Sequence, residues 1–176
     1  LDVMRLISGA SNQLQVYDSE LNDIEWMNAA GIRLDRVLVQ QSTREQWMEQ
    51  AKFLQENVTN DVIDKAFTKV PETVQDSTLR VIKKNLKGRR QNLTDIAERY
   101  YNHLNELVIL TGTDKDDYIE VNRIRDNETS VKIWRIKGGE KADVLVDKTF
   151  NRDITKEIWI YGLDDKDIFE VIGEGK

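Results

Sequence analysis

Carboxylates crowd two short glycine turns of this sequence, and they are its clearest candidates for chemistry. The six candidate residues are Asp114, Asp116, Asp117, Asp164, Asp165 and Asp167. A hard cation such as Ca²⁺ takes about six to eight oxygen ligands, which clustered carboxylates and turn carbonyls can supply. Asp side chains more commonly cap tight turns by accepting hydrogen bonds from nearby backbone N–H groups. The sequence therefore predicts candidate Ca²⁺ ligands, with turn capping as the alternative.

Both turns belong to an internal repeat. Residues 112–121 read GTDKDDYIEV and residues 162–171 read GLDDKDIFEV, so five of ten positions are identical at a spacing of fifty residues. A short apolar run precedes each copy, at 108–110 and at 158–160. Self-similarity at a fixed spacing marks a repeated structural unit. We therefore predict two units of strand, glycine turn and strand.

The second turn resembles the nonapeptide of calcium-binding parallel β-rolls, G-G-x-G-x-D-x-U-x. Gly162, Asp167 and Phe169 stand where that family has its first glycine, its aspartate and its apolar residue. Leu163 and Asp165 stand where the family has glycine, and a roll needs several consecutive copies. The resemblance implies a Ca²⁺-stabilised β module, and these departures argue against a complete roll.

A basic run is the second candidate site. No acidic residue lies between Ser77 and Thr94. The residues expected to face a partner are Arg80, Lys83, Lys84, Lys87 and Arg90. Such a run can meet phosphate, an acidic protein or lipid headgroups, and the alternative is a solvated helix face. It contains no aromatic residue on which bases could stack, so we expect no nucleic-acid partner.

Several kinds of catalytic site are excluded by composition. The sequence has no cysteine and one histidine, His103, which rules out thiolate sites and His-rich metal centres. Glu98, Tyr100 and Tyr101 lie near His103 and suggest acid–base chemistry. No nucleophile with an orienting third group accompanies them. We therefore predict no catalytic residue and no required cofactor, and interpret these side chains as packing residues.

Charge, length and composition indicate a folded chain. The sequence has 176 residues and a net charge of −6, with 33% charged and 39% apolar residues. The acidity lies mainly in residues 106–176, which hold 12 Lys and Arg against 17 Asp and Glu. No run of eighteen apolar residues occurs, so we expect no membrane span. The first residue is Leu1 rather than Met, which suggests an excised part of a longer polypeptide.

Helical periodicity dominates residues 1–105. We expect helices over 19–30, from a capping box of Ser42 and Glu45 to residue 58, and from residue 60 to 70. An apolar stripe with steps of three or four residues predicts one continuous helix over 77–105, about 45 Å long. The alternative is two helices broken at Asn92, with Thr94 as a new cap. Residues 1–17 are ambiguous, since Val3 to Ile7 fit a strand or a helical turn.

Residues 106–176 have the two-residue period of strands. Strands are predicted at 108–110, 118–123, 130–137, 142–146, 155–161 and 167–172, with a hairpin turn at Gly138 and Gly139. The fold class is therefore α+β: a mainly helical N-terminal part, 1–105, with one long helix, followed by a small, mostly antiparallel β-sheet of about five strands in 106–176.

Three stretches together resemble a segment of large bacterial cell-envelope proteins. They are Leu34 to Arg36 before a helix with Gln46 and Trp47, residues 86–101, and residues 149–162. In that family the segment lies between a calcineurin-like metallophosphoesterase domain and a C-terminal outer-membrane β-barrel of the surface-antigen type. The resemblance implies a periplasmic or cell-surface accessory region associated with the outer membrane. The phosphoesterase motifs are absent from this sequence, so no catalytic residue is carried over.

Three hypotheses for function follow. The first is a non-catalytic accessory module that contacts other domains of the same polypeptide or a protein partner. The second is a β module stabilised by Ca²⁺. The third is a fragment of a phosphoesterase-like enzyme whose catalytic residues lie outside this chain.

Overall fold

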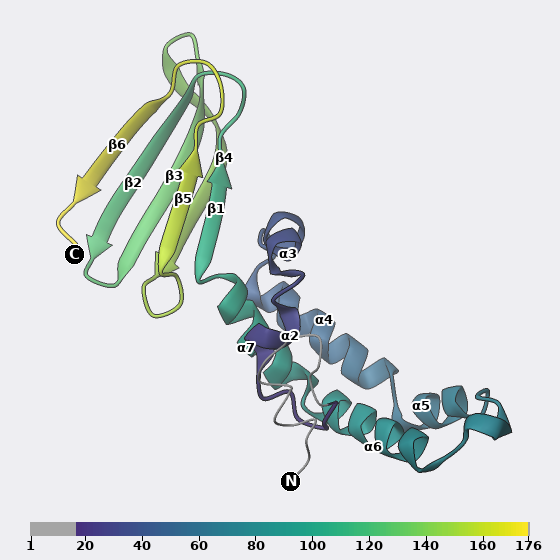
Figure 1. Cartoon of the computed structure of the whole chain (residues 1–176). Coiled ribbons are helices and arrows are strands. Elements are labelled where there is room, and N and C mark those ends of the chain that lie inside the picture. The colour runs from purple at the N-terminus through teal and green to yellow at the C-terminus, as the bar shows by residue number, and fades with distance from the viewer. Residues whose placement is uncertain (1–16, 176) are drawn as a thin grey trace. The chain divides into compact units, whose positions relative to one another are not determined.

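A computed structural model describes residues 17–175. The chain forms two compact units, with the boundary after His103. Helices make up the described part of the first unit and strands make up the second, so the predicted α+β class is confirmed (Figure 1). The ambiguous stretch from Val3 to Ile7 lies outside the described residues. In the part that is described, helices fall short of the length and apolar character needed to cross a bilayer.

The first unit consists of short helices joined by tight connections. These are α2 (Ile24–Asn28), α3 (Ile32–Val39), α4 (Arg44–Asn57), α5 (Asn60–Phe67), a 3-10 turn η2 (Glu72–Val74), α6 (Ser77–Gln91) and α7 (Leu93–Leu104). The helix predicted from residue 19 begins later, because Asp23 accepts a hydrogen bond from the N–H of Trp26 at 2.9 Å. The predicted capping box is shifted by one residue: Thr43 and Gln46 form it.

The prediction of one continuous helix over 77–105 is wrong, and the alternative break at Asn92 is confirmed. Thr94, the expected new cap, lies within α7. Asn92 leaves helical geometry, and its N–H donates to the carbonyls of Gly88 and Arg90. The side-chain amide of Gln55, on α4, donates to the carbonyls of Arg90 and Gln91 at 3.0 and 2.8 Å. Carbonyls at a helix end need such partners. Gln55 therefore stabilises the break from a distant part of the sequence.

Trp47 joins α4 to α7. Its indole N–H donates to the carbonyl of Ala97 at 2.9 Å, and its ring lies 6.2 Å from the rings of Tyr100 and Tyr101. Arg44 forms an ion pair with Glu98 one turn away. Aromatic contacts of this kind stabilise packing beyond simple area burial, so Trp47 is the main anchor between the two helices.

Gly88 lets the chain segment at 17–19 lie directly on α6. A Cβ at this position would collide with Ser19. On either side, Asn85 donates to the carbonyl of Tyr17 at 2.6 Å and Arg89 donates to that of Asp18 at 2.7 Å. The glycine weakens the helix by roughly 1 kcal/mol relative to alanine, and the close approach explains why it is tolerated.

The second unit contains two sheets. Its strands are β1 (Leu107–Thr111), β2 (Asp117–Arg125), β3 (Glu128–Lys137), β4 (Glu140–Asn151), β5 (Glu157–Tyr161) and β6 (Ile168–Gly173). One sheet has the order β4-β3-β2-β6, and the other pairs β1 with β5. Hairpins make β2-β3 and β3-β4 antiparallel, whereas β1-β5 and β2-β6 are parallel. The predicted mostly antiparallel sheet is thus a mixed sheet and a separate parallel pair.

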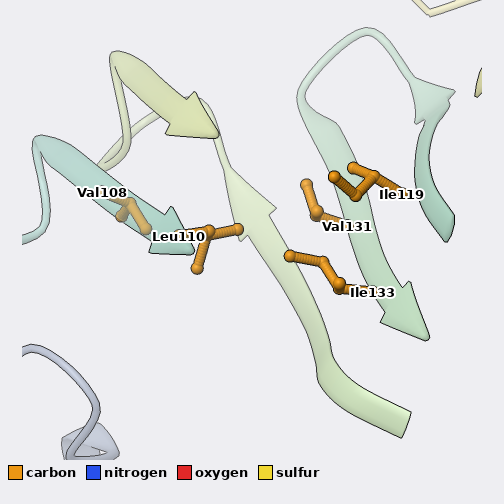
Figure 2. Packing of buried hydrophobic residues seen from close by; sticks show 5 residues of the cluster. All are labelled: Val108, Leu110, Ile119, Val131 and Ile133. Atoms are coloured by element: carbon orange, nitrogen blue, oxygen red, sulfur yellow. The ribbon is translucent and has the colours of Figure 1, made fainter. Parts of the chain in front are cut away.

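The core lies between these two sheets. Val108 and Leu110 of β1 face Ile119 of β2 and Val131 and Ile133 of β3, and all five are at most 2% exposed (Figure 2). Ile158 and Ile160 of β5 pack against this cluster. Burial of apolar side chains contributes about 1.5–3 kcal/mol each, so this cluster is the main source of stability in the second unit.

Candidate functional site

The sequence repeat forms two stacked rungs in the second unit. The first rung is β1, the corner at 112–116 and β2; the second rung is β5, the corner at 162–167 and β6. Val108 lies opposite Ile158 in one parallel pair, and Val121 lies opposite Val171 in the other. Both pairs have the fifty-residue shift of the repeat. The prediction that each glycine turn joins two strands is confirmed, and the strands of the two rungs are related by a translation.

Asp117 closes the first corner from a fully buried position. Its carboxylate accepts hydrogen bonds from the N–H and hydroxyl of Thr113 and from Nη1 of Arg135, which lies 3.3 Å from Oδ1. A buried charge needs such partners. A Cβ at Gly112 would approach Oδ2 of Asp117 to 2.7 Å and the carbonyl oxygen of Gly162 to 2.9 Å. Glycine is therefore required where the two corners touch.

Three hydrogen bonds connect the corners of the two rungs. The N–H of Gly112 donates to the carbonyl of Tyr161 at 2.8 Å. The N–H of Asp117 donates to Oδ1 of Asp167 at 3.0 Å, and the N–H of Lys166 donates to Oδ1 of Asp116 at 3.0 Å. Strands and corner thus form one continuous interface between the rungs.

The structure places the six candidate Ca²⁺ ligands in these stacked corners. Asp116, Asp117 and Asp167 each accept a backbone N–H, as described, and Asp164 accepts that of Asp165 at 2.9 Å. Within residues 17–175, no three of the six carboxylates converge into one group of potential ligands. The bonds of Asp117 and Asp164 are local, as turn capping expects, whereas Asp116 and Asp167 accept from the other corner. The Ca²⁺ interpretation stays a prediction.

The outer side of the second rung carries apolar residues that nothing in residues 17–175 covers. Opposed residues of neighbouring strands point to the same face of a sheet. Phe169 lies opposite Ile119, and Val171 lies opposite Val121. Ile119 is fully buried, whereas Phe169 is 55% exposed and Val171 is 68% exposed. The inner face of the sandwich therefore continues past the core onto an uncovered strand.

Figure 1 shows β6 as the outermost strand of the four-stranded sheet. In the two-stranded sheet, β5 is likewise an edge strand. Both strands therefore have an outer edge that is unpaired among the described residues. We call this surface the open face: the side chains of Phe169 and Val171 with the outer edges of β5 and β6.

The two edge strands of the larger sheet differ in chemistry. Strand β4 carries four charged residues between its ends, Lys141, Asp143, Asp147 and Lys148. Strand β6 reads IFEVIG, with four large apolar residues and one charge. Charges on an edge strand oppose pairing with another chain, whereas a long apolar edge invites it. The open face therefore has the composition of a pairing surface.

The residues of the open face were predicted as strand, and nothing in the sequence marked them as a site. Their apolar character is ordinary for a strand, and only the topology shows that β6 has one neighbour. Arg135 was missed for a similar reason: it is a β3 residue that reaches the first corner from a neighbouring strand. No sequence signal pairs it with Asp117.

The basic run lines an open groove of about 630 Å³ in the first unit. Four of its five predicted contact residues lie there, Arg80, Lys83, Lys84 and Lys87. Asp64 partly neutralises the groove, because its carboxylate lies 3.1 Å from the Nζ of Lys83 and 2.7 Å from that of Lys87. Arg90 is half-buried and outside the groove lining. Binding of an anionic partner here stays a prediction.

The residues suggested for acid–base chemistry have structural contacts in the first unit. Tyr100 donates its hydroxyl hydrogen to Asp35. Burial of the Tyr100 hydroxyl is the larger cause of its raised pKa, and this hydrogen bond is the second. Glu98 is paired with Arg44. His103 lies 4.0 Å from Glu25, measured from Nδ1 to Oε1. Their contacts are those of packing residues between helices.

Comparison with known proteins gave no match among family models, curated proteins or solved structures. The geometry of the open face is therefore the basis for a proposal about function.

Proposed function

We propose that this chain is a non-catalytic interaction module and that the open face binds an extended segment of polypeptide. The observation that supports this is the exposure of Phe169 and Val171, which continue the buried face of the sandwich. An extended segment that adds to a sheet edge gains backbone hydrogen bonds, and its alternate side chains gain apolar burial. The open face offers both kinds of contact on the same two strands.

The cellular context is part of the proposal. From the resemblance to envelope proteins, we propose that the module lies in the periplasm or at the cell surface, within a longer polypeptide. An antibody against this chain should detect that polypeptide in the envelope fraction of the source organism. Detection in the cytosolic fraction alone would contradict the envelope assignment and would leave the binding surface unaffected.

The binding function can be tested with peptides that have no relation to the repeat. A displayed library of random peptides, each about twelve residues long, is selected on the full chain. We expect selected peptides to be extended and apolar at alternate positions, as strand addition requires. A lysine on the inner face of β6 would place a charge against the incoming apolar side chains. Val171→Lys should therefore weaken these peptides about tenfold, the equivalent of roughly 1.4 kcal/mol.

Val144→Lys is the matched control, because Val144 is a 56% exposed valine on the other edge strand of the same sheet. It should leave the affinities unchanged. Circular dichroism of both variants checks that the fold is kept. The proposal is wrong if no selected peptide discriminates between Val171→Lys and the unsubstituted chain.

A further inference from the structure

We infer that the partner of the open face is a third rung: a strand, glycine corner and strand that stacks in parallel on the second rung. This inference rests on the proposed function and adds the chemistry and the direction of the partner. It follows from the way in which the first two rungs are joined.

One shift of fifty residues relates the strands of the first rung to those of the second. The corners differ in backbone, because Leu163 and Asp165 have positive φ angles of 81° and 70°, whereas their counterparts Thr113 and Lys115 do not. The parallel pairs β1-β5 and β2-β6 have the same shift of fifty residues, from Leu107 opposite Glu157 to Arg123 opposite Gly173. Between them, the corners are joined by the N–H groups of Gly112 and Asp117, which both donate toward the second rung. Strand, corner and strand are therefore stacked as one unit.

The second rung keeps two of the three residues that join the corners; the place of Asp116, which accepts the N–H of Lys166, is taken by Lys166. Gly162 takes the place of Gly112, and Asp167 takes the place of Asp117. Because Gly162 directly follows β5 and Asp167 directly precedes β6, the shift that relates the strands directs their N–H groups to the outer side, toward the positions of a carbonyl and an aspartate in the next corner. It also places an incoming strand beside β5, over Phe169 and Val171, as β1 lies over Val131 and Ile133 in the core.

These positions define the chemistry of the partner. Each of its two strands needs apolar side chains at alternate positions, equivalent to Ile158 and Ile160 in the first strand and to Phe169 and Val171 in the second. Between the strands it needs a glycine, because a Cβ at the equivalent Gly162 would collide with the carboxylate of the rung's own Asp167. Five positions after that glycine it needs an aspartate, to accept the N–H of Asp167.

A second copy of this chain fits the open face less well. Its first rung cannot stack there completely, because one edge of β2 is paired with β3 and the other with β6. Two open faces could meet only with β6 antiparallel to β6, since a two-fold axis relates identical surfaces. That arrangement would put the corners at opposite ends and leave the N–H groups of Gly162 and Asp167 without a facing corner.

The test uses a labelled peptide with the sequence of residues 156–175 as the third rung, added to the full chain. Its affinity is measured by fluorescence anisotropy, and its position is mapped by amide chemical shifts. We expect binding with shifts on β5, the second corner and β6. Val171→Lys in the protein should weaken binding about tenfold, equivalent to roughly 1.4 kcal/mol, and Val144→Lys should have no effect.

A second peptide, with Gly162→Val and Asp167→Ala but the same strands, tests the corner. It should bind about fivefold more weakly, because it loses the carboxylate that accepts the N–H of Asp167 and carries a branched side chain in the corner. Equal binding of the two peptides would overturn the third-rung inference and leave the proposed function intact. Binding that is insensitive to Val171→Lys would overturn both the third-rung inference and the proposed function. This result is expected if the peptide replaces the chain's own second rung.

Sedimentation equilibrium of the full chain without peptide provides the remaining outcome. A concentration-dependent dimer that Val171→Lys dissociates would show that a second copy covers the open face, and the third-rung inference would be wrong. A monomer is the expected result.

Discussion

Replacing Asp117 with alanine should unfold the second unit at a much lower concentration of urea. The change removes a fully buried carboxylate and leaves Arg135, whose side chain is only 19% exposed, without its charged partner. Breaking a buried ion pair from one side costs about 3–5 kcal/mol. Arg135 keeps two acceptors, the Thr113 hydroxyl at 2.8 Å and the Asp116 carbonyl at 3.3 Å. We therefore expect the low end of that range, about 3 kcal/mol.

The four tryptophans allow each unit to be followed separately, because Trp134 and Trp159 lie in the second unit and Trp26 and Trp47 in the first. Their indole N–H signals are recorded by NMR during a urea titration. With a urea dependence of about 1 kcal/mol per molar for a unit of this size, the midpoint from Trp134 and Trp159 should fall by about 3 M.

Asp143→Ala is the control, since it removes a paired aspartate at the surface. The Nζ of Lys137 lies 2.6 Å from Oδ2 of Asp143, but both side chains are more than 60% exposed. Water and salt screen such pairs, so the midpoint should not change measurably. If Asp117→Ala behaved like this control, the role assigned to the buried carboxylate in the corner would be refuted.

Three further predictions concern the helix break, pH and calcium. Gln55→Ala should destabilise the first unit by about 1 kcal/mol, because the Gln91 carbonyl loses its side-chain donor and the Arg90 carbonyl keeps only the N–H of Asn92. Replacing the exposed Gln50 with alanine should not have this effect, and equal urea midpoints from the Trp47 indole would contradict the prediction. Hydrogen bonds from Lys87 and then Lys83 lower the pKa of Asp64, so the ionised carboxylate stabilises the first unit fully above its unfolded pKa of about 3.9. That contribution is lost as the pH falls through the lower folded pKa. Between about pH 5 and 2, the melting temperature should therefore fall less for Asp64→Asn than for the unsubstituted chain. Parallel curves of melting temperature against pH would reject the linkage. The Ca²⁺ hypothesis predicts a higher melting temperature in a few millimolar CaCl₂ than in EDTA, since a ligand that binds the native state raises it; identical scans would reject it.

The sequence was informative where its signals are local. The glycine at each corner, the apolar run before it and the two-residue period after it predicted both rungs. The parallel pairing was missed because neighbouring strands usually form hairpins. The spacing of fifty residues between the copies, which is also the shift of the strand register, was the available clue.

Distant contacts account for the errors in the first unit. The break at Asn92, which the sequence offered as the alternative, is stabilised by Gln55, which lies on another helix and has no sequence relation to the apolar stripe over 77–105. Gly88 reads as a weak point of a helix until the segment at Ser19 is placed against it. The open face is the same kind of case, because the exposure of Val171 depends on the order of strands and not on the residue.

The separation of the rungs along the chain has a consequence for folding kinetics. Residues that pair between rungs are fifty positions apart, whereas β2, β3 and β4 are joined by short hairpins. Closing a long loop costs entropy before its contacts form, so non-local pairing is slow. The meander of β2 to β4 should therefore form early and β5 and β6 should dock late, which a delayed phase in the Trp159 signal would report. Pro71, the only proline, lies in the first unit, so isomerisation within the second unit cannot be the source of that phase.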